Sequence, residues 1–133
     1  MITRKGFEPA KMPLTTIRVL LVEDEVMIRM MVADMVEELG HAVAAEAGDV
    51  GRAAELAETG LFDLAILDVN LNGKMSFPVA DIIMRRRIPL IFASGYALNN
   101  IPAAFGSTPK LQKPFQIATL AKAITAAREF ARH

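Results

Sequence analysis

Two kinds of apolar pattern alternate along the chain. Short unbroken apolar runs are typical of strands covered on both faces, and apolar residues recurring every three or four positions are typical of helices. Such strand-like runs occupy residues 17–22, 64–68 and 89–94, and a weaker strand at 41–46 and a short one at 110–112 complete the set. We therefore predict an α/β protein with five strands in a parallel sheet, helices on both faces and right-handed crossovers.

The first two helical segments have clear ends. The inward face of the first is predicted to consist of Ile28, Met31, Val32, Met35 and Leu39. Gly40 ends this helix, while Asp49 is a good N-cap for a second helix that ends at Gly60. We interpret the methionines of the first helix as core filler: Met27, Met30, Met31 and Met35.

The second half of the chain is less regular. A third helix is predicted with Pro78 near its first turn and solvated arginines 85–87 in its last turn, where cations suit the helix dipole. Residues 71–74 are expected to form a loop. Helix breakers in 97–108 predict a short or irregular fourth helix of at most two turns. The last helix has one apolar face, made of Ile117, Leu120, Ala121, Ile124 and Ala127.

Length and composition support a single domain. Of the 133 residues, 53% are hydrophobic, enough to bury a core. Residues 1–15 lack periodicity and are expected to be a disordered lead-in, with Met12 as a candidate natural start, before a domain over 16–133. His41 and His133 have no partners at ligand spacing and are interpreted as surface residues.

Charge and cysteine content exclude several classes. Fifteen basic and fifteen acidic residues cancel, so neither a nucleic-acid nor a membrane partner is expected. The absence of cysteine excludes disulfides, thiolate metal sites and cysteine nucleophiles. Without a membrane span or a signal-peptide core, a cytoplasmic protein is the default expectation.

The predicted strands end in residues that can carry chemistry: Glu23, Asp24, Asp68, Ser94 and Lys113. The carboxyl ends of parallel strands lie at one edge of the sheet, so these side chains should converge there. Neighbouring carboxylates repel unless a cation neutralises them, and an all-oxygen ligand set suits Mg²⁺. A carboxylate beside Mg²⁺ and a lysine can attack phosphorus, while Ser94 could donate to a phosphoryl oxygen. The spacing therefore predicts phosphoryl capture on Asp68.

Four motifs in this order resemble the receiver domain of two-component response regulators: LVEDE at 21–25, LDVN at 67–70, ASGY at 93–96 and KPF at 113–115. The resemblance covers residues 17–131 and implies a flavodoxin-like, doubly wound sheet in strand order 2-1-3-4-5. It implies no enzyme activity beyond the domain's own phosphorylation and dephosphorylation.

The resemblance also implies a role for each site residue. Asp68 would be the phosphoacceptor, and Ser94 and Lys113 would contact the phosphoryl group. The Mg²⁺ ligands would be Asp24, Asp68, the backbone carbonyl of Asn70, and Glu23 through water. The Lys113–Pro114 bond is usually cis in this family.

Two positions depart from the usual receiver pattern. Lys110 stands where an aromatic switch residue is common, and Asn72 stands where proline is common. With the stretch 92–96, these departures are similar to the FATGUY subfamily of alphaproteobacteria. This similarity implies a single-domain regulator, a monomer or weak dimer, that is paired with a histidine kinase of the HWE or a related class. Output would pass through protein–protein contact, with Tyr96 as a candidate switch.

Other functions stay open at this point. The domain could serve as a phosphate sink or a phosphorelay intermediate. A phosphohydrolase of the haloacid-dehalogenase type is disfavoured, because it needs a second acid where Asn70 stands. A pseudo-receiver would require a damaged acid cluster. Taken singly, Asp24 could be a helix N-cap, Ser94 a turn residue and Lys113 a solvated lysine.

Overall fold

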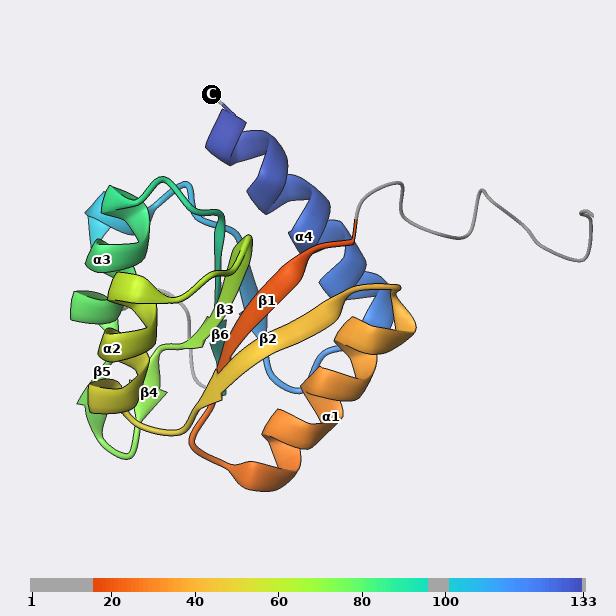
Figure 1. Ribbon diagram of the computed structural model, residues 1–133, viewed down its shortest axis with the longest axis horizontal. Coiled ribbons are helices and arrows are strands. Elements are labelled where there is room, and N and C mark those ends of the chain that lie inside the picture. The colour runs from red at the N-terminus through yellow and green to blue at the C-terminus, as the bar shows by residue number, and fades with distance from the viewer. Residues whose placement is uncertain (1–15, 96–100, 133) are drawn as a thin grey trace, which may run out of the picture.

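The central feature of the fold is a five-stranded parallel sheet, seen in the computed structural model, which describes residues 16–95 and 101–132 (Figure 1). Its strands are β1 (Arg18–Val22), β2 (Ala42–Ala47), β3 (Leu64–Asp68), β6 (Leu90–Ser94) and β7 (Lys110–Gln112). Their order is β2-β1-β3-β6-β7, and all four pairings are parallel. The predicted order 2-1-3-4-5 is confirmed.

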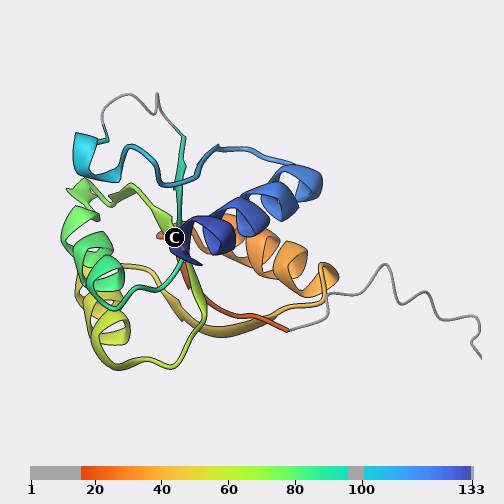
Figure 2. The same cartoon turned by 90° about the horizontal axis from the view of Figure 1, so that it is seen from above.

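Helices cover both faces of this sheet (Figures 1 and 2). They are α1 (Val26–Glu38), α2 (Val50–Thr59), α3 (Phe77–Arg85) and α4 (Ile117–Arg132). Helices α1 and α4 lie on one face of the sheet, and α2 and α3 lie on the other. The doubly wound, flavodoxin-like architecture is therefore confirmed. Within the described ranges, none of the helices has the length and apolarity to cross a bilayer.

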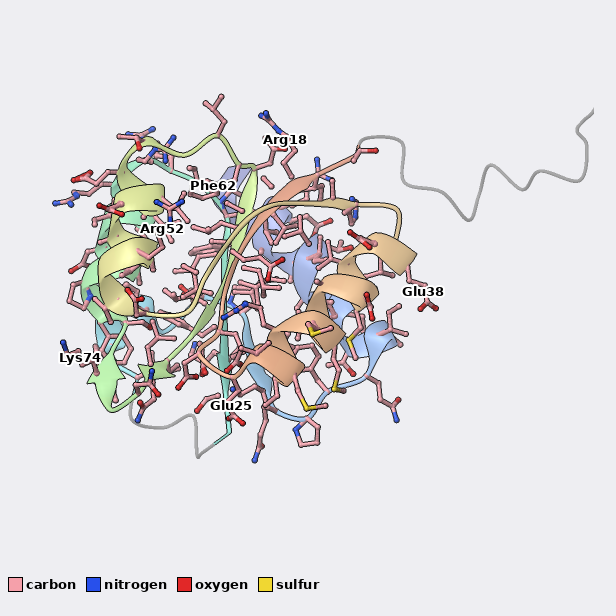
Figure 3. The ribbon with its side chains drawn as sticks, turned by 60° about the horizontal axis from the view of Figure 1, so that its bottom comes forward. Arg18, Glu25, Glu38, Arg52, Phe62 and Lys74 are labelled. Carbon is pink, nitrogen blue, oxygen red and sulfur yellow. The ribbon has the colours of Figure 1, made fainter. Side chains whose placement is uncertain are left out.

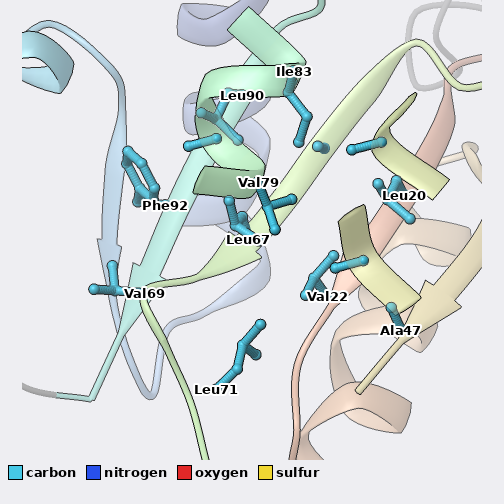
Figure 4. Close-up of a cluster of buried hydrophobic side chains, with 14 of the residues drawn as sticks. Leu20, Val22, Ala47, Leu67, Val69, Leu71, Val79, Ile83, Leu90 and Phe92 are labelled. Atoms are coloured by element: carbon cyan, nitrogen blue, oxygen red, sulfur yellow. The ribbon is translucent and has the colours of Figure 1, made fainter. Parts of the chain in front are cut away.

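Alternate residues of each central strand supply two separate cores. Leu21, Ile66 and Ile91 pack with α1 and α4, while Leu20 and Leu67 pack with α2 and α3. The second core is the one drawn in Figure 4. A strand that buries both faces has no polar position, which explains the unbroken apolar runs in the sequence.

The expected short fourth helix is present as a single 3₁₀ turn, Ala103–Phe105. Residues 96–100, which precede it, lie outside the described residues. Phe105 is buried, with its ring centroid 5.7 Å from that of Phe77 and 5.3 Å from that of Phe92. Aromatic packing therefore fixes a segment whose backbone forms little regular structure.

The loop predicted at 71–74 is wrong, because these residues form a hairpin. Two short strands, β4 (Asn70–Leu71) and β5 (Lys74–Met75), pair antiparallel. The turn residues Asn72 and Gly73 have φ angles of 53° and 86°. A two-residue turn with positive φ at both positions strongly favours Asn-Gly, so the sequence did carry the signal.

The burial predicted for the α1 methionines is wrong for three of the four, and only Met35 packs against the core. The exposed fractions of Met27, Met30 and Met31 are 78%, 61% and 55%. Figure 3 shows sulfur atoms along the outside of this helix. Four residues of the predicted inward face, Ile28, Val32, Met35 and Leu39, do pack against the core, and Met31 is the exception. Apolar residues also occupy the outer side of α1, so an apolar side chain in this helix does not by itself indicate burial.

The helix ends confirm one cap and correct two other predictions. The Asp49 carboxylate accepts a hydrogen bond from the Arg52 N–H at 2.8 Å and caps α2 as predicted. The N-cap of α1 is Glu25 rather than Asp24, and its side chain makes no capping bond. Arg86 follows α3 and is not simply solvated. Its guanidinium donates to two carbonyls at the end of α2 and lies 5.2 Å from the centroid of the Phe62 ring.

Candidate functional site

The carboxyl ends of the strands bring the predicted acids and the lysine together. Three strand residues face the core formed with α1 and α4: Leu21, Ile66 and Leu111. The residue two positions after each of them is a site residue: Glu23, Asp68 and Lys113, respectively. Strand alternation therefore directs all three toward the same face of the sheet. Neighbouring Glu25 lies at this end of the molecule, and Arg18 and Phe62 lie at the opposite end (Figure 3).

The Lys113 ammonium links two buried acids. Its Nζ donates to Oε1 of Glu23 at 2.7 Å and to Oδ2 of Asp68 at 2.9 Å. Only 12% of its side chain is exposed, and the two carboxylate side chains are 4% and 6% exposed. Lys113 is therefore a buried cation shared by two carboxylates, and not the solvated lysine of the simpler interpretation.

Burial and shared partners shift the pKa values of these groups. Desolvation raises the pKa of both Glu23 and Asp68, although their hydrogen bonds to Lys113 act in the opposite direction. Burial alone would lower the pKa of Lys113, but its bonds to the two acids outweigh this effect and raise it. One lysine cannot neutralise two buried carboxylates, so the site favours a further cation.

Three consecutive acids could contribute to holding that cation. Carboxylate oxygens of Glu23, Asp24 and Glu25 lie within 4.8 Å of one another. The second oxygen of Glu23 already accepts the backbone N–H of Glu25 at 3.0 Å, which fixes its side chain. The donor set contains only oxygen atoms and lies beside Asp68, so the residues present fit Mg²⁺.

The β4–β5 hairpin forms a wall of the site. The Asn72 backbone N–H donates to Oδ2 of Asp24 at 3.0 Å, and the Gly73 N–H donates to Oδ1 of Asn70 at 2.7 Å. Asn70, whose carbonyl was the expected ligand, therefore lies at the base of this hairpin. The contact between Asn72 and Asp24 was not predicted from the sequence.

A cavity of about 580 Å³ opens over these groups. Asp24, Asp68, Asn70, Ser94 and Lys113 all contribute to its lining. Ser94 ends β6 and is 5% exposed, and its carbonyl accepts the Lys113 N–H at 2.7 Å. The predicted cis bond before Pro114 is confirmed. The candidate switch Tyr96 lies outside the described residues.

Two supporting residues were missed by sequence reasoning. The buried Ser76 hydroxyl donates to the Asp68 carbonyl at 2.6 Å. The Arg29 guanidinium donates to the Glu23 carbonyl at 2.7 Å and to the Glu46 carboxylate at 3.0 Å. A serine before a helix and an arginine within one are common, so neither gave a usable signal.

Lys110 also has a role that the sequence did not indicate. Its Nζ donates to the backbone carbonyls of Phe105, Gly106 and Thr108 at 3.1, 3.0 and 2.7 Å. An ammonium group has three donor hydrogens, so the three carbonyls can satisfy it completely. The residue at the usual aromatic position therefore anchors the 3₁₀ turn.

A doubly wound α/β domain with clustered acids and a buried lysine at the carboxyl ends of its strands belongs to the flavodoxin-like class, in which ligands bind at that edge of the sheet. Comparison with known proteins agrees. Residues 19–125 match the response regulator receiver domain, so the chain belongs to this family. A receiver fold is typical of two-component signalling regulators rather than of catalytic enzymes.

Individual relatives support the same placement. The transcriptional regulatory protein PdtaR of Mycobacterium tuberculosis is 37% identical over 111 residues, covering 80% of this chain and 54% of PdtaR. The chain thus spans about half the length of the curated relatives it matches. The solution structure of SdrG from Sphingomonas melonis Fr1 is 39% identical, with a TM-score of 0.77, covering 85% of this chain and 97% of SdrG. The anti-anti-sigma factor PhyR from Bartonella quintana is 26% identical, with a TM-score of 0.74, covering 89% and 49%.

Proposed function

We propose that this protein accepts a phosphoryl group on Asp68 from a histidine kinase and passes the signal on by protein–protein contact. The observation that carries the proposal is the arrangement of Asp68, Glu23 and Lys113. A buried carboxylate is held 2.9 Å from a buried ammonium, beside further acids, at the mouth of a cavity. In the transfer, a carboxylate oxygen of Asp68 forms a bond to phosphorus as the bond from phosphorus to the donor nitrogen breaks.

The surrounding residues would assist this transfer in different ways. Asp24, Asp68 and the Asn70 carbonyl would hold Mg²⁺, with Glu23 acting through water. When bound, Mg²⁺ would neutralise charge on the phosphoryl oxygens. Lys113 would move from its two carboxylates toward a phosphoryl oxygen, and the Ser94 hydroxyl would donate to another.

Phosphorylation by a small phosphodonor tests the assignment directly. Incubation with acetyl phosphate and MgCl₂ should add the mass of one phosphoryl group to the intact protein. Asp68→Asn should abolish the gain, since an amide oxygen is a poor nucleophile. Asp63→Asn is the matched control, because Asp63 is an exposed aspartate paired with Arg18 at the opposite end of the sheet. A mass gain that persists in Asp68→Asn would falsify the assignment.

The partners are proposed from the resemblance and the relatives. Membership of the FATGUY subfamily would place an HWE or related histidine kinase upstream, and Tyr96 would couple the site to the output surface. Similarity to PhyR, described as an anti-anti-sigma factor, supports a downstream protein partner in transcriptional control. Rapid phosphoryl transfer from a labelled HWE kinase to the wild-type protein but not to Asp68→Asn would support this pairing.

Two other functions are distinguished by the fate of the phosphoryl group. A phosphorelay intermediate would pass its phosphoryl group to the histidine of a second protein, and a phosphate sink would return it to water without a stable downstream complex. Hydrolase activity of the haloacid-dehalogenase type remains disfavoured, because Asn70 cannot supply the general acid. Measuring the labelled phosphoryl group over time, on this protein, on a second protein and as free phosphate, separates these outcomes.

A further inference from the structure

The β4–β5 hairpin joins two parts of the site that are distant in sequence. Its first strand begins at Asn70, two residues after Asp68, and its tip contacts Asp24, which follows β1. The bond between the Asn72 N–H and Asp24 Oδ2 links residues 48 positions apart. The hairpin therefore helps to set the orientation of a residue that the proposed function makes a metal ligand.

The base of the hairpin is firmly held. The Ser76 N–H donates to the Val69 carbonyl at 2.9 Å, and its hydroxyl donates to the Asp68 carbonyl at 2.6 Å. Leu71, which is 1% exposed, anchors the first strand in the core below α2 and α3. With its base and one side chain fixed, the hairpin can hold its tip at a defined position.

The turn geometry leaves one N–H available for Asp24. In a two-residue turn the flanking residues, here Leu71 and Lys74, pair with each other. The N–H of Asn72 lies outside that pair and points to the carboxylate. A proline at this position would offer no N–H.

We propose that the backbone N–H of Asn72 is a positioning donor that orients Asp24 for Mg²⁺. One carboxylate oxygen accepts this N–H, and the other is left for the cation. Hydrogen bonds to ligating carboxylates orient them, and losing such a bond typically lowers metal affinity about 10- to 100-fold. The proposal rests on the proposed function, since it presumes that Asp24 binds Mg²⁺.

The test is to disturb the turn without removing any ligand. Asn72→Val and Gly73→Val each place a β-branched residue at positive φ, which opposes the turn. A Cβ at Gly73 meets no atom within 4 Å, so this variant acts through the backbone alone. Titration with MgCl₂, followed by amide NMR shifts, should show the dissociation constant raised about tenfold or more in both variants.

Two control variants separate the effect of a disturbed turn from the effects of losing the Asn72 side chain and of adding a valine to the hairpin. Asn72→Gly retains the N–H and accepts positive φ, so its Mg²⁺ affinity should stay close to that of the unmodified protein. Met75→Val places the same β-branched residue on an exposed strand position of this hairpin, where such residues are favoured. Thermal unfolding should show that all four variants remain folded. In addition, Asp24→Ala should speed hydrogen exchange of the Asn72 amide without any metal.

The outcomes are distinct. Unchanged or tighter Mg²⁺ binding in both Asn72→Val and Gly73→Val would overturn the proposal, as would equally weak binding in Asn72→Gly. If the unmodified protein binds no Mg²⁺, the proposed function fails and this inference fails with it. If the unmodified protein binds Mg²⁺ and takes up phosphoryl, a negative result in the variants overturns the inference alone.

Discussion

The hydroxyl of Ser76 donates to the backbone carbonyl of Asp68 at 2.6 Å, and both residues are buried. Ser76 occupies the N-cap position of α3 but makes no side-chain cap there. Its hydroxyl is used to tie the start of that helix to the end of β3. The residue that directly precedes α3 thus holds the main chain of the proposed phosphoacceptor.

Ser76→Ala should therefore destabilise the protein by about 1–3 kcal/mol, because it removes a donor from a buried carbonyl. Urea denaturation measures the change in the free energy of unfolding. Ser107→Ala is the control, since Ser107 is exposed and its loss should change stability by less than about 0.5 kcal/mol. Equal effects of the two substitutions would show that the Ser76 bond contributes little.

Lys113→Met should have a larger effect. It leaves Glu23 and Asp68 buried without their shared cation, which should cost about 3 kcal/mol at pH 7. The loss should shrink as the pH falls into the range where these two carboxyls become protonated, and their raised pKa values move that range upward.

Two further variants test this explanation of the Lys113 effect. Adding Asp68→Asn to Lys113→Met should recover part of the stability, because it removes one buried charge. Lys122→Met, on the exposed side of α4, should be close to neutral. An effect of Lys113→Met that is independent of pH would argue for lost packing rather than lost charge.

Lys110→Met should loosen the 3₁₀ turn. Three backbone carbonyls would lose a charged donor, worth roughly 1.5–3 kcal/mol if the turn opens as a unit. Amide hydrogen exchange in residues 103–108 should then become at least about tenfold faster. Lys74→Met, at an exposed position on β5, is the matched control. Unchanged exchange would mean that aromatic packing of Phe105 alone holds this segment.

The surroundings of His41, which lies away from the site, predict that the stability of the protein depends on pH. His41 was expected to be a simple surface residue, but its Nδ1 accepts the Ile17 N–H at 3.1 Å and it is partly buried. Burial, with a smaller contribution from the charge of Arg128, lowers the pKa of His41 below its usual 6.5. Neutral His41 therefore stabilises the folded protein fully above about pH 6.5, the usual pKa of histidine. This contribution is lost as the pH falls through the lowered pKa that His41 has in the folded protein.

The variant His41→Asn tests whether His41 makes the protein less stable as the pH falls. Asparagine can still accept the Ile17 N–H but does not titrate, so the variant should lose less stability than the wild type between pH 7 and pH 5. The wild-type slope can exceed that of the variant by at most about 1.4 kcal/mol per pH unit. Parallel pH profiles of the two proteins would contradict the assignment.

Local patterns were sufficient for most of the fold. Unbroken apolar runs located the three central strands, β1, β3 and β6, because strands buried on both faces leave few polar positions. The edge strands β2 and β7 have exposed positions and carry a weaker signal. Asp49 located the start of α2 because an N-cap acts within one turn of chain. The hairpin at 70–75 is equally local, because the positive φ angles at Asn72 and Gly73 favour an Asn-Gly turn.

Orientation could not be predicted in the same way. Met27, Met30 and Met31 carry an apolar signal, yet the packing of α1 on the sheet leaves them exposed. Arg86 resembles a solvated helix-end arginine, yet the approach of α2 places two carbonyls within reach of its guanidinium. In both cases the outcome depends on which other element lies nearby.

The sequence by itself determined which residues stand at the strand ends, and strand alternation placed Glu23, Asp68 and Lys113 on a common face. Tertiary structure decided how they pair. The bond from Lys113 to Glu23 joins residues 90 positions apart, and the bond from Asn72 to Asp24 spans 48. Such contacts depend on strand order and register, which arise only when the whole sheet is assembled.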